Sequence, residues 1–454
     1  MRRLLWTPIL SCVLLANPQA VMFADEDGVP PPNVVLIVSD DQDYTDLSCY
    51  PHPTDVHTPN LDRLAKGGVR FTQAYATAPV CAPSRAGLMT GRYQQRFGCY
   101  TNLTAHGVPE TEVFLPAILR DAGYATAAIG KWHLGQDSRF HPQRRGFDDF
   151  FGFLPGMHDY FNSLDTPGYR PILRGETPVE SVEYLTRDFG TEAVDFITAN
   201  ATNRFFLYLA FNAVHTPYQA PKEYRDRFAD RDPNRATYLA MLAALDDQVG
   251  RVLDALERCD VFDNTIVVFL SDNGGTALAE RHAGEVRPIR GHKGQTYEGG
   301  IRVPMLLQWP ARFAGGQVFE SPVSTLDLAP TLLAATQSPI PSGVILDGKD
   351  LTPFLTRGSR HSPHDAIFWF YPGKNEGEWW AVRASEWKLV HTGGGAIELY
   401  DVEHDAREEV DLSARRPDLV DSLRSRFDAW KRTLAAPYKY KKKGPIKAIK
   451  PPKD

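Results

Sequence analysis

Short apolar runs that end in polar side chains recur along the chain and predict the frame of the fold. Residues 33–38 (Asn-Val-Val-Leu-Ile-Val) form the first run, and residues 265–270 (Thr-Ile-Val-Val-Phe-Leu) form a late one. Two similar runs lie between them, at residues 124–130 and 205–211. A continuous apolar run of this length is typical of a strand buried on both faces. We therefore expect four buried strands at these positions.

Helical patterns separate the four predicted strands. They cover residues 113–122 and 183–199, and a longer pattern places apolar side chains on one face at Tyr238, Leu242, Leu245, Val249, Val252 and Leu256. Strands that alternate with helices predict a mostly parallel sheet with helices on both faces. The expected fold class is thus α/β, with one large sheet between helices.

Each predicted strand ends in a different set of polar side chains. These endings are Ser39-Asp40-Asp41, Lys131-Trp132-His133, Asn212-Ala213-Val214-His215 and Ser271-Asp272-Asn273. One such ending is usually a solvated exit from the core. Because open α/β sheets bind ligands outside the carboxyl ends of their strands, four endings together predict a functional site at one sheet edge.

The acidic endings predict a metal site of a definite kind. Asp40, Asp41, Asp272 and Asn273 offer hard oxygen ligands, and neither a second thiol nor a cluster of histidines accompanies them. Such a set favours Ca²⁺ or Mg²⁺ over Zn²⁺.

A smaller module is expected after a stretch rich in Pro, Gly and Ser at residues 339–348. Residues 379–383, 387–391 and 397–401 are predicted to be short antiparallel strands. A final helix would place Leu419, Leu423, Phe427 and Trp430 on one face. We assign residues 25–350 to the large domain, 351–437 to the small one and 438–454 to a basic, disordered tail.

Length, charge and the amino terminus restrict the class of protein. The chain has 454 residues, a composition that is 43% hydrophobic and a net charge of -6, which gives no electrostatic reason to expect nucleic acid. Residues 1–24 combine a basic start with a short apolar core, as in a secretory signal peptide cleaved after Ala20 or Ala24, and lipidation at Cys12 is the alternative. No later run approaches the roughly 20 apolar residues that span a bilayer. We expect an exported protein without stable membrane association. In such a protein, Cys49 and Cys99 are the cysteines most suited to a disulfide.

Cys81 begins the run Cys-Ala-Pro-Ser-Arg-Ala-Gly-Leu-Met-Thr-Gly-Arg. Taken by itself, the pattern predicts a helix start at Pro83, with Arg85 one turn above the thiol on the same face. The whole run resembles the signature of the type I sulfatases, in which a separate maturase oxidises the cysteine of Cys-x-Pro-x-Arg to formylglycine. This family belongs to the alkaline phosphatase-like superfamily. Secreted bacterial arylsulfatase-like carbohydrate sulfatases are the members that the chain resembles most in character.

Further blocks extend the resemblance over residues 33–335. They are Gly130 to Gly135, the loop from Asn212 to Pro217, and Gly291 to Gly294 followed by Tyr297 to Pro304. The resemblance implies an alkaline phosphatase-like fold with a small carboxy-terminal subdomain. It also implies a calcium ion held by Asp40, Asp41, Asp272, Asn273 and modified Cys81.

The resemblance implies a role for each polar residue in sulfate ester hydrolysis. Hydrated formylglycine at Cys81 attacks sulfur, with Arg85 and the metal lowering the pKa of the attacking hydroxyl and Asp272 accepting its proton. Lys131 and Lys293 hold the sulfate oxygens. His215, helped by Lys293, protonates the leaving alcohol, and His133 takes the proton whose loss expels sulfate. Cations around the oxygens and an acid for the leaving group are what this chemistry requires.

Loops between the strands are candidates for sugar recognition, with surface packing as the equal alternative. Their polar side chains are His141, Arg144, His158, Asp159 and His282. Export and these loops favour a sulfated saccharide as substrate, such as sulfated galactose or N-acetylgalactosamine. The alternatives are a phosphatase or phosphodiesterase of the same superfamily and a catalytically weak protein that binds sulfated glycans. Cys81 argues against the first, and the intact set of polar residues argues against the second.

Overall fold

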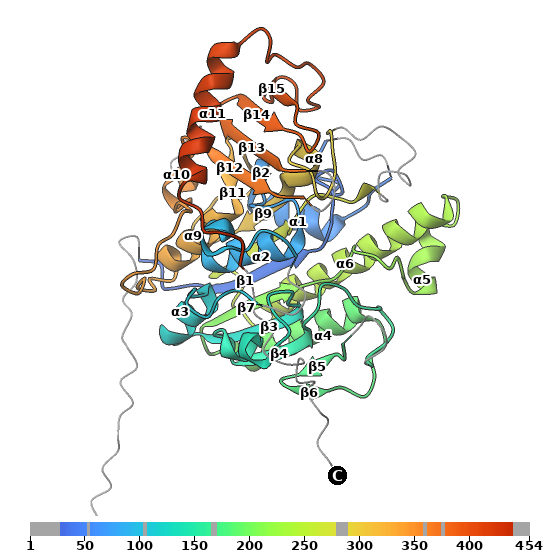
Figure 1. The fold of residues 1–454 in the computed structure, drawn as a ribbon. Helices are drawn as coiled ribbons and strands as arrows, with labels where there is room; N and C mark the ends of the chain where they lie inside the picture. The colour runs from blue at the N-terminus through green and yellow to red at the C-terminus, as the bar shows by residue number, and fades with distance from the viewer. Residues whose placement is uncertain are drawn as a thin grey trace, which may run out of the picture.

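The computed structural model describes residues 28–51, 55–102, 107–164, 170–277, 289–356, 361–373 and 377–438. Figure 1 shows a large sheet with helices on both sides and a smaller sheet that is covered by one long helix near the carboxyl end. The expected signal peptide at residues 1–24 lies outside the described residues, as does the expected tail except for Tyr438.

The large sheet has a parallel centre. Its strands follow the order β10-β2-β9-β8-β1-β7-β3-β4-β5-β6, with β11 beside β2. Strands β8, β1, β7, β3 and β4 run parallel, whereas β9 runs antiparallel to both β8 and β2. Their bounds are β1 Asn33–Ser39, β2 Val69–Tyr75, β3 Ala125–Lys131, β4 Asp149–Phe153, β5 Leu173–Arg174, β6 Thr177–Pro178, β7 Phe205–Ala210, β8 Thr265–Ser271, β9 Arg302–Gln308, β10 Gln317–Phe319 and β11 Val323–Ser324. All four predicted strands are confirmed, each within one residue at either end.

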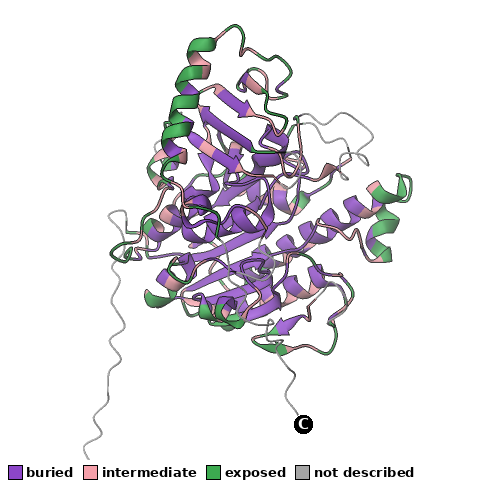
Figure 2. Ribbon diagram, viewed as in Figure 1, coloured by how far each residue is buried: buried purple, intermediate pink, exposed green. Residues whose placement is uncertain are grey.

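Helices cover both faces of this sheet, as expected. On one face lie α1 (Pro59–Gly67), α4 (Leu185–Ala199) and α6 (Pro233–Arg258), and on the other lie α2 (Cys81–Thr90), α3 (Leu115–Asp121) and α9 (Leu328–Ala335). Strand β1 shows why its run is apolar throughout. Val35 and Ile37 enter the first core, while Val34, Leu36 and Val38 enter the second. Figure 2 shows the resulting continuous buried centre. Shorter helices are α5 (Lys222–Arg225), α8 (Glu298–Ile301) and α10 (Thr352–Thr356).

The small sheet is antiparallel and lies between α11 and the large domain. It contains β12 (Ile367–Tyr371), β13 (Trp379–Ala384), β14 (Trp387–His391) and β15 (Ile397–Asp401) in sequence order. Helix α11 (Pro417–Lys431) buries Leu423, Phe427 and Trp430 against one face. The other face packs on Tyr75, Tyr297 and Ile301 of the large domain. The predicted strands and helix are confirmed, and β12 is a strand that the pattern did not indicate.

The expected disulfide between Cys49 and Cys99 is wrong, since both cysteines are free. Cys49 packs against the core on one face of the large sheet, whereas Cys99 is buried in the core on the opposite face. The sheet therefore separates the two thiols. Among the described residues, none of the helices is long and apolar enough to cross a bilayer.

Candidate active site

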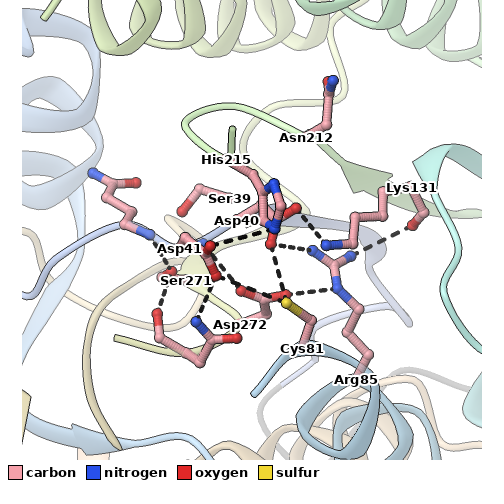
Figure 3. A network of polar contacts seen from close by, with 12 residues as sticks. Ser39, Asp40, Asp41, Cys81, Arg85, Lys131, Asn212, His215, Ser271 and Asp272 are labelled. Carbon is pink, nitrogen blue, oxygen red and sulfur yellow. Dashed lines mark hydrogen bonds and ion pairs between the residues drawn. The ribbon is translucent and has the colours of Figure 1, made fainter. Parts of the chain in front are cut away.

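Polar side chains from distant parts of the chain meet where the central parallel strands end (Figure 3). Asp40 and Asp41 follow β1, Asp272 follows β8, and Lys131 ends β3. The loop after β7 joins them because Asp40 N–H donates to Ala213 O at 3.0 Å and Val214 N–H donates to Asp40 O at 3.0 Å. Those backbone bonds bring His215 beside the aspartates. The convergence expected from the strand endings is present.

Cys81 lies at the first residue of α2, inside this cluster. Its Sγ is 3.5 Å from Asp40 Oδ1, 3.7 Å from Asp41 Oδ1 and 3.1 Å from Lys293 Nζ. The side chain is buried, and burial above all raises the pKa of the thiol, which the charges of Lys131 and Lys293 only partly oppose. The helix begins two residues earlier than expected, so Pro83 is its third residue, where its missing N–H costs no intrahelical bond.

Arg85 is fully buried one turn into α2 and holds three elements together. Its Nε donates to Asp272 Oδ2 at 2.7 Å, and its Nη1 donates to Tyr208 Oη at 3.1 Å and to the carbonyl of Lys131 at 3.4 Å. Burial lowers the pKa of Arg85, but Asp272 outweighs it and keeps the guanidinium charged. Tyr208 is a contact that the sequence did not indicate, because an aromatic residue inside an apolar strand carries no signal of function.

Two lysines pair with the two aspartates. Lys131 Nζ lies 2.5 Å from Asp40 Oδ2, and Lys293 Nζ lies 2.7 Å from Asp41 Oδ1. Burial raises the pKa of Asp40, yet the charge of Lys131 and the other cations outweighs it and holds that pKa well below its usual range. Lys293 keeps 18% of its side chain exposed and Lys131 none, so Lys293 is the more accessible of the two lysines.

The two histidines have different surroundings. His215 Nε2 lies 3.4 Å from Asp41 Oδ2, and its Nδ1 lies 2.7 Å from the carbonyl of Thr216. That carbonyl requires a proton on Nδ1, so Nε2 is the ring nitrogen that faces the site. Within the described residues, Nδ1 of His133 is buried without a hydrogen-bond partner. Burial lowers the pKa of His133 well below its usual range, which keeps this ring neutral.

The donor set fits a hard divalent cation. Ligand atoms of Asp40, Asp41, Cys81 and His215 all lie within 4.8 Å of one another. Asn273 donates from Nδ2 to Asp41 Oδ1 at 2.8 Å, and its Oδ1 is buried with no donor among the described residues. Asp272 is not part of this group of four, and its Oδ1 accepts the backbone N–H of Asp41 at 3.3 Å. Buried carboxylates beside an amide oxygen without a donor are ligands that Ca²⁺ accepts.

The residues predicted to bind sugar are held mostly by local contacts. His141 Nε2 lies 3.0 Å from Gly175 O, both ring nitrogens of His158 lie 2.7 Å from backbone carbonyls, and Asp159 accepts a bond from Gln219. Arg144 pairs with Glu176 at the surface. These contacts support the packing alternative for His141 and His158, which are buried. His282 lies outside the described residues.

Comparison with known proteins gives two family matches. The sulfatase model matches residues 32–338, and the model of the C-terminal region of N-sulphoglucosamine sulphohydrolase matches residues 292–431. N-acetylgalactosamine-6-sulfatase of Homo sapiens is 38% identical over 358 residues, covering 73% of this chain and 67% of that protein. Arylsulfatase A of Homo sapiens is 34% identical over 442 residues, covering 90% and 85%.

Solved structures agree with these matches. The crystal structure of Ps i-CgsB has a TM-score of 0.85 and 35% identity, covering 90% of this chain and 94% of that one. The same protein in complex with k-i-k-neocarrahexaose gives a TM-score of 0.84. The phosphonate monoester hydrolase of Agrobacterium radiobacter, at 23% identity and a TM-score of 0.65, shares the fold. The expected alkaline phosphatase-like fold is confirmed.

Proposed function

Since the chain belongs to the sulfatase family and is a sulfuric ester hydrolase, we propose that it removes sulfate from a sulfated carbohydrate. The observation that carries the proposal is the position of Cys81, between Lys293 and the aspartates that follow β1. The saccharide class is supported by N-acetylgalactosamine-6-sulfatase, which is similar in sequence, and by Ps i-CgsB, whose structure contains a neocarrahexaose. A sulfated galactose or N-acetylgalactosamine is the substrate that we favour.

The nucleophile in this proposal is residue 81 after a separate maturase has oxidised its thiol to formylglycine. When formylglycine is present, its hydrated aldehyde supplies one hydroxyl to attack sulfur and a second whose deprotonation releases sulfate. In this proposal Asp272, which accepts a hydrogen bond from Arg85 Nε, takes the proton of the attacking hydroxyl. Because Arg85 is buried and also bonded to Tyr208 and Lys131, it fixes the position of α2 relative to β3 and β7.

Lys131 and Lys293 bind the sulfate oxygens in this proposal. Both ammonium groups lie at the aspartates that flank residue 81, so a sulfate group beside that residue meets positive charge from two sides. Charge that spreads over the sulfate oxygens and the leaving oxygen during the reaction is stabilised by such preorganised cations. Lys131 is enclosed, whereas Lys293 is also open to an entering substrate.

The two histidines divide the proton transfers. Protonated His215 donates from Nε2 to the oxygen of the leaving alcohol, while the Thr216 carbonyl retains the proton on Nδ1. Neutral His133 then accepts the proton whose removal from residue 81 expels sulfate. Burial keeps His133 in the neutral form that can accept this proton.

A calcium ion would be held by Asp40, Asp41, Asp272, Asn273 and residue 81. Bound there, it would supply positive charge to the sulfate oxygens. We expect Asp41→Ala to lose the metal and nearly all turnover while the far-ultraviolet circular dichroism spectrum stays unchanged. Elemental analysis of purified protein measures the metal directly. Stoichiometric zinc, or activity that survives prolonged dialysis against a calcium chelator, would contradict this assignment.

The test of the proposed function is desulfation of a panel of sulfated saccharides after coexpression with the maturase. We expect release of inorganic sulfate from at least one saccharide and an aldehyde on the peptide that contains residue 81. Cys81→Ser is the matched control, because a serine ester cannot eliminate sulfate by re-forming a carbonyl. Full activity in material that retains an unmodified Cys81 thiol would contradict the proposal.

A further inference from the structure

The loop that carries Lys293 packs directly on the short helix α8. Gly299 N–H donates to Arg290 O at 2.6 Å, and Gln295 N–H donates to His292 O at 3.0 Å within the loop. A Cβ atom at Gly299 would lie 2.2 Å from the carbonyl oxygen of Gly291. A Cβ atom at Gly300 would lie 2.0 Å from the carbonyl oxygen of Gln295. The two glycines therefore permit a backbone contact that ties the loop position to the position of α8.

Helix α8 is in turn fixed by charged residues of the small domain. Lys388 of β14 donates to Glu298 Oε1 at 2.8 Å and lies 2.9 Å from Glu408 Oε1. The other oxygen of Glu408 accepts the backbone N–H of Glu298 at 2.8 Å, and Tyr75 donates to Glu298 Oε2 at 2.8 Å. Lys388, Glu298 and Glu408 are all fully buried.

Contacts at the two ends of the loop reach the same domain. Arg290 donates to Tyr400 Oη at 2.7 Å and to Glu408 O at 2.9 Å. Tyr297 donates to Glu398 Oε2 at 2.6 Å. Residues 290 and 297 thus bracket Lys293, and each is bonded to the strand β15 or the turn after it.

We propose that Lys388 is a positioning residue for Lys293, acting through Glu298 and α8. The small domain then takes part in catalysis by holding the lysine loop against residue 81, without itself touching the sulfate. This inference rests on the proposed role of Lys293 in sulfate binding.

The charged arrangement supplies a directional constraint that apolar packing alone does not. The aromatic contacts of Tyr75 and Tyr297 with β12 and β13 already bury the face of the small sheet. Hydrophobic burial is non-directional, whereas an ammonium between the acidic side chains of Glu298 and Glu408 fixes where both lie. A buried ion pair often adds little to the free energy of unfolding. We therefore explain the pair between Lys388 and Glu298 by its effect on the position of α8.

A double-mutant cycle on kcat/KM tests the proposal, with turnover normalised to the measured formylglycine content. We expect Lys388→Met to lower kcat/KM by about 10- to 100-fold, the range that a misplaced catalytic group produces. In a Lys293→Met background the same change should cost less than about threefold, because coupled residues are not additive. Lys431→Met is the control, since Lys431 pairs with Glu378 at the surface of the same domain, and it should leave kcat/KM unchanged.

The outcomes separate the positioning role from the proposed function. An equal loss from Lys388→Met in both backgrounds would overturn the positioning role while leaving Lys293 as a sulfate ligand. An unchanged kcat/KM in Lys293→Met alone would overturn the role of Lys293 and the positioning with it.

If Lys388→Met does not fold, Tyr297→Phe and Arg290→Gln take its place, since each removes a bond of the loop to the small domain. Their losses should be about three- to tenfold in the parent and should disappear in the Lys293→Met background. Additive losses would overturn the proposal.

Discussion

At the scale of single residues, the two histidines of the site have different surroundings, and the proposed function gives each a different proton transfer. His215 has its Nδ1 at a carbonyl and its Nε2 near Asp41, whereas His133 is buried with a pKa well below its usual range. Burial disfavours an imidazolium, which keeps the His133 ring neutral. The proposed function accordingly assigns the acid to His215 and the base to His133.

This separation predicts different defects for the two alanine variants. His215→Ala should lower sulfur transfer from sugar sulfates by about 100-fold or more, because those alcohols need a proton to leave. The same variant should nearly retain transfer from nitrocatechol sulfate, whose leaving group needs no acid. His133→Ala should instead accumulate a covalent sulfate on residue 81 with both substrates, which mass spectrometry of that peptide detects. Equal losses on both substrates for His215→Ala, without an adduct in His133→Ala, would reverse our assignment.

The close packing of Gly156 against His133 predicts that a side chain at position 156 displaces the histidine ring. A Cβ atom at Gly156 would lie 2.5 Å from Cε1 and Nε2 of the His133 ring. Gly156→Ala should therefore displace the ring and lower kcat by about 10-fold or more, since small displacements of a catalytic group are costly. Gly394→Ala is the control, because the nearest atom to its Cβ is Thr392 Oγ1 at 3.8 Å. A normal kcat in Gly156→Ala would show that the ring can shift without loss of function.

At the scale of elements, the strands that could be predicted from the sequence are those buried on both faces. β1 and β8 are apolar without interruption because each side of the sheet has its own core. β2 and β9 lie in the same sheet, but the sequence Val-Arg-Phe-Thr-Gln-Ala-Tyr of β2 is mixed, and nothing in β9 indicates that it runs antiparallel. Strand direction and partner are set by tertiary packing, which a local pattern does not contain.

The candidate site could be predicted from the sequence only where its residues directly follow these buried strands. The strand endings placed Asp40, Asp41, Lys131 and Asp272 together because parallel strands end on one edge of the sheet. Lys293 stands in a loop and was reached only through the resemblance to sulfatases. Tyr208 and Lys388 were missed, since a tyrosine or lysine inside a strand carries no pattern that distinguishes a contact to the site.

Helix α1 shows how one element is stabilised by another. Thr58, at its amino-terminal cap, makes no side-chain capping bond. Asp246 of α6 instead accepts the backbone N–H groups of Asn60 at 3.1 Å and Leu61 at 2.8 Å. Burial raises the pKa of Asp246 to about 6, so desolvation offsets part of the gain from these bonds.

We predict that Asp246→Ala lowers the free energy of unfolding by about 1–2 kcal/mol, because the N–H groups of Asn60 and buried Leu61 lose their acceptor. The adjacent Asp247→Ala is the control. Asp247 makes a surface ion pair with Arg227 at 3.3 Å, and such pairs contribute about 0–1 kcal/mol. Urea unfolding of both variants measures the difference. Equal stability of the two variants would mean that α1 does not depend on the carboxylate of Asp246.

At the scale of the whole molecule, the two domains share a buried charged cluster. Glu298 and Arg302 come from the large domain, while Arg383, Lys388 and Glu408 come from the small one. Burial raises the pKa of Glu298, but the charge of Lys388 outweighs it and lowers that pKa to about 2. For Glu408, burial prevails over Lys388 and raises the pKa from 4.5 to about 7. The interface therefore contains one carboxyl group that titrates near neutral pH.

This group predicts a pH dependence of stability with a definite sign. Between pH 4.5 and about 7 the folded protein keeps a proton on Glu408 that the unfolded chain has released. Because the folded state binds more protons in this window, the contribution of Glu408 is fully present below pH 4.5 and is lost as the pH rises through about 7. Glu408→Gln removes the titration and should give a flatter dependence of the free energy of unfolding on pH between 5 and 7. Denaturant unfolding of both proteins at several pH values provides the comparison, in which the shared contributions of other groups cancel. Parallel curves for the two proteins would show that Glu408 is already ionised in the folded state, and the cluster would then hold both carboxylates in charged form around Lys388.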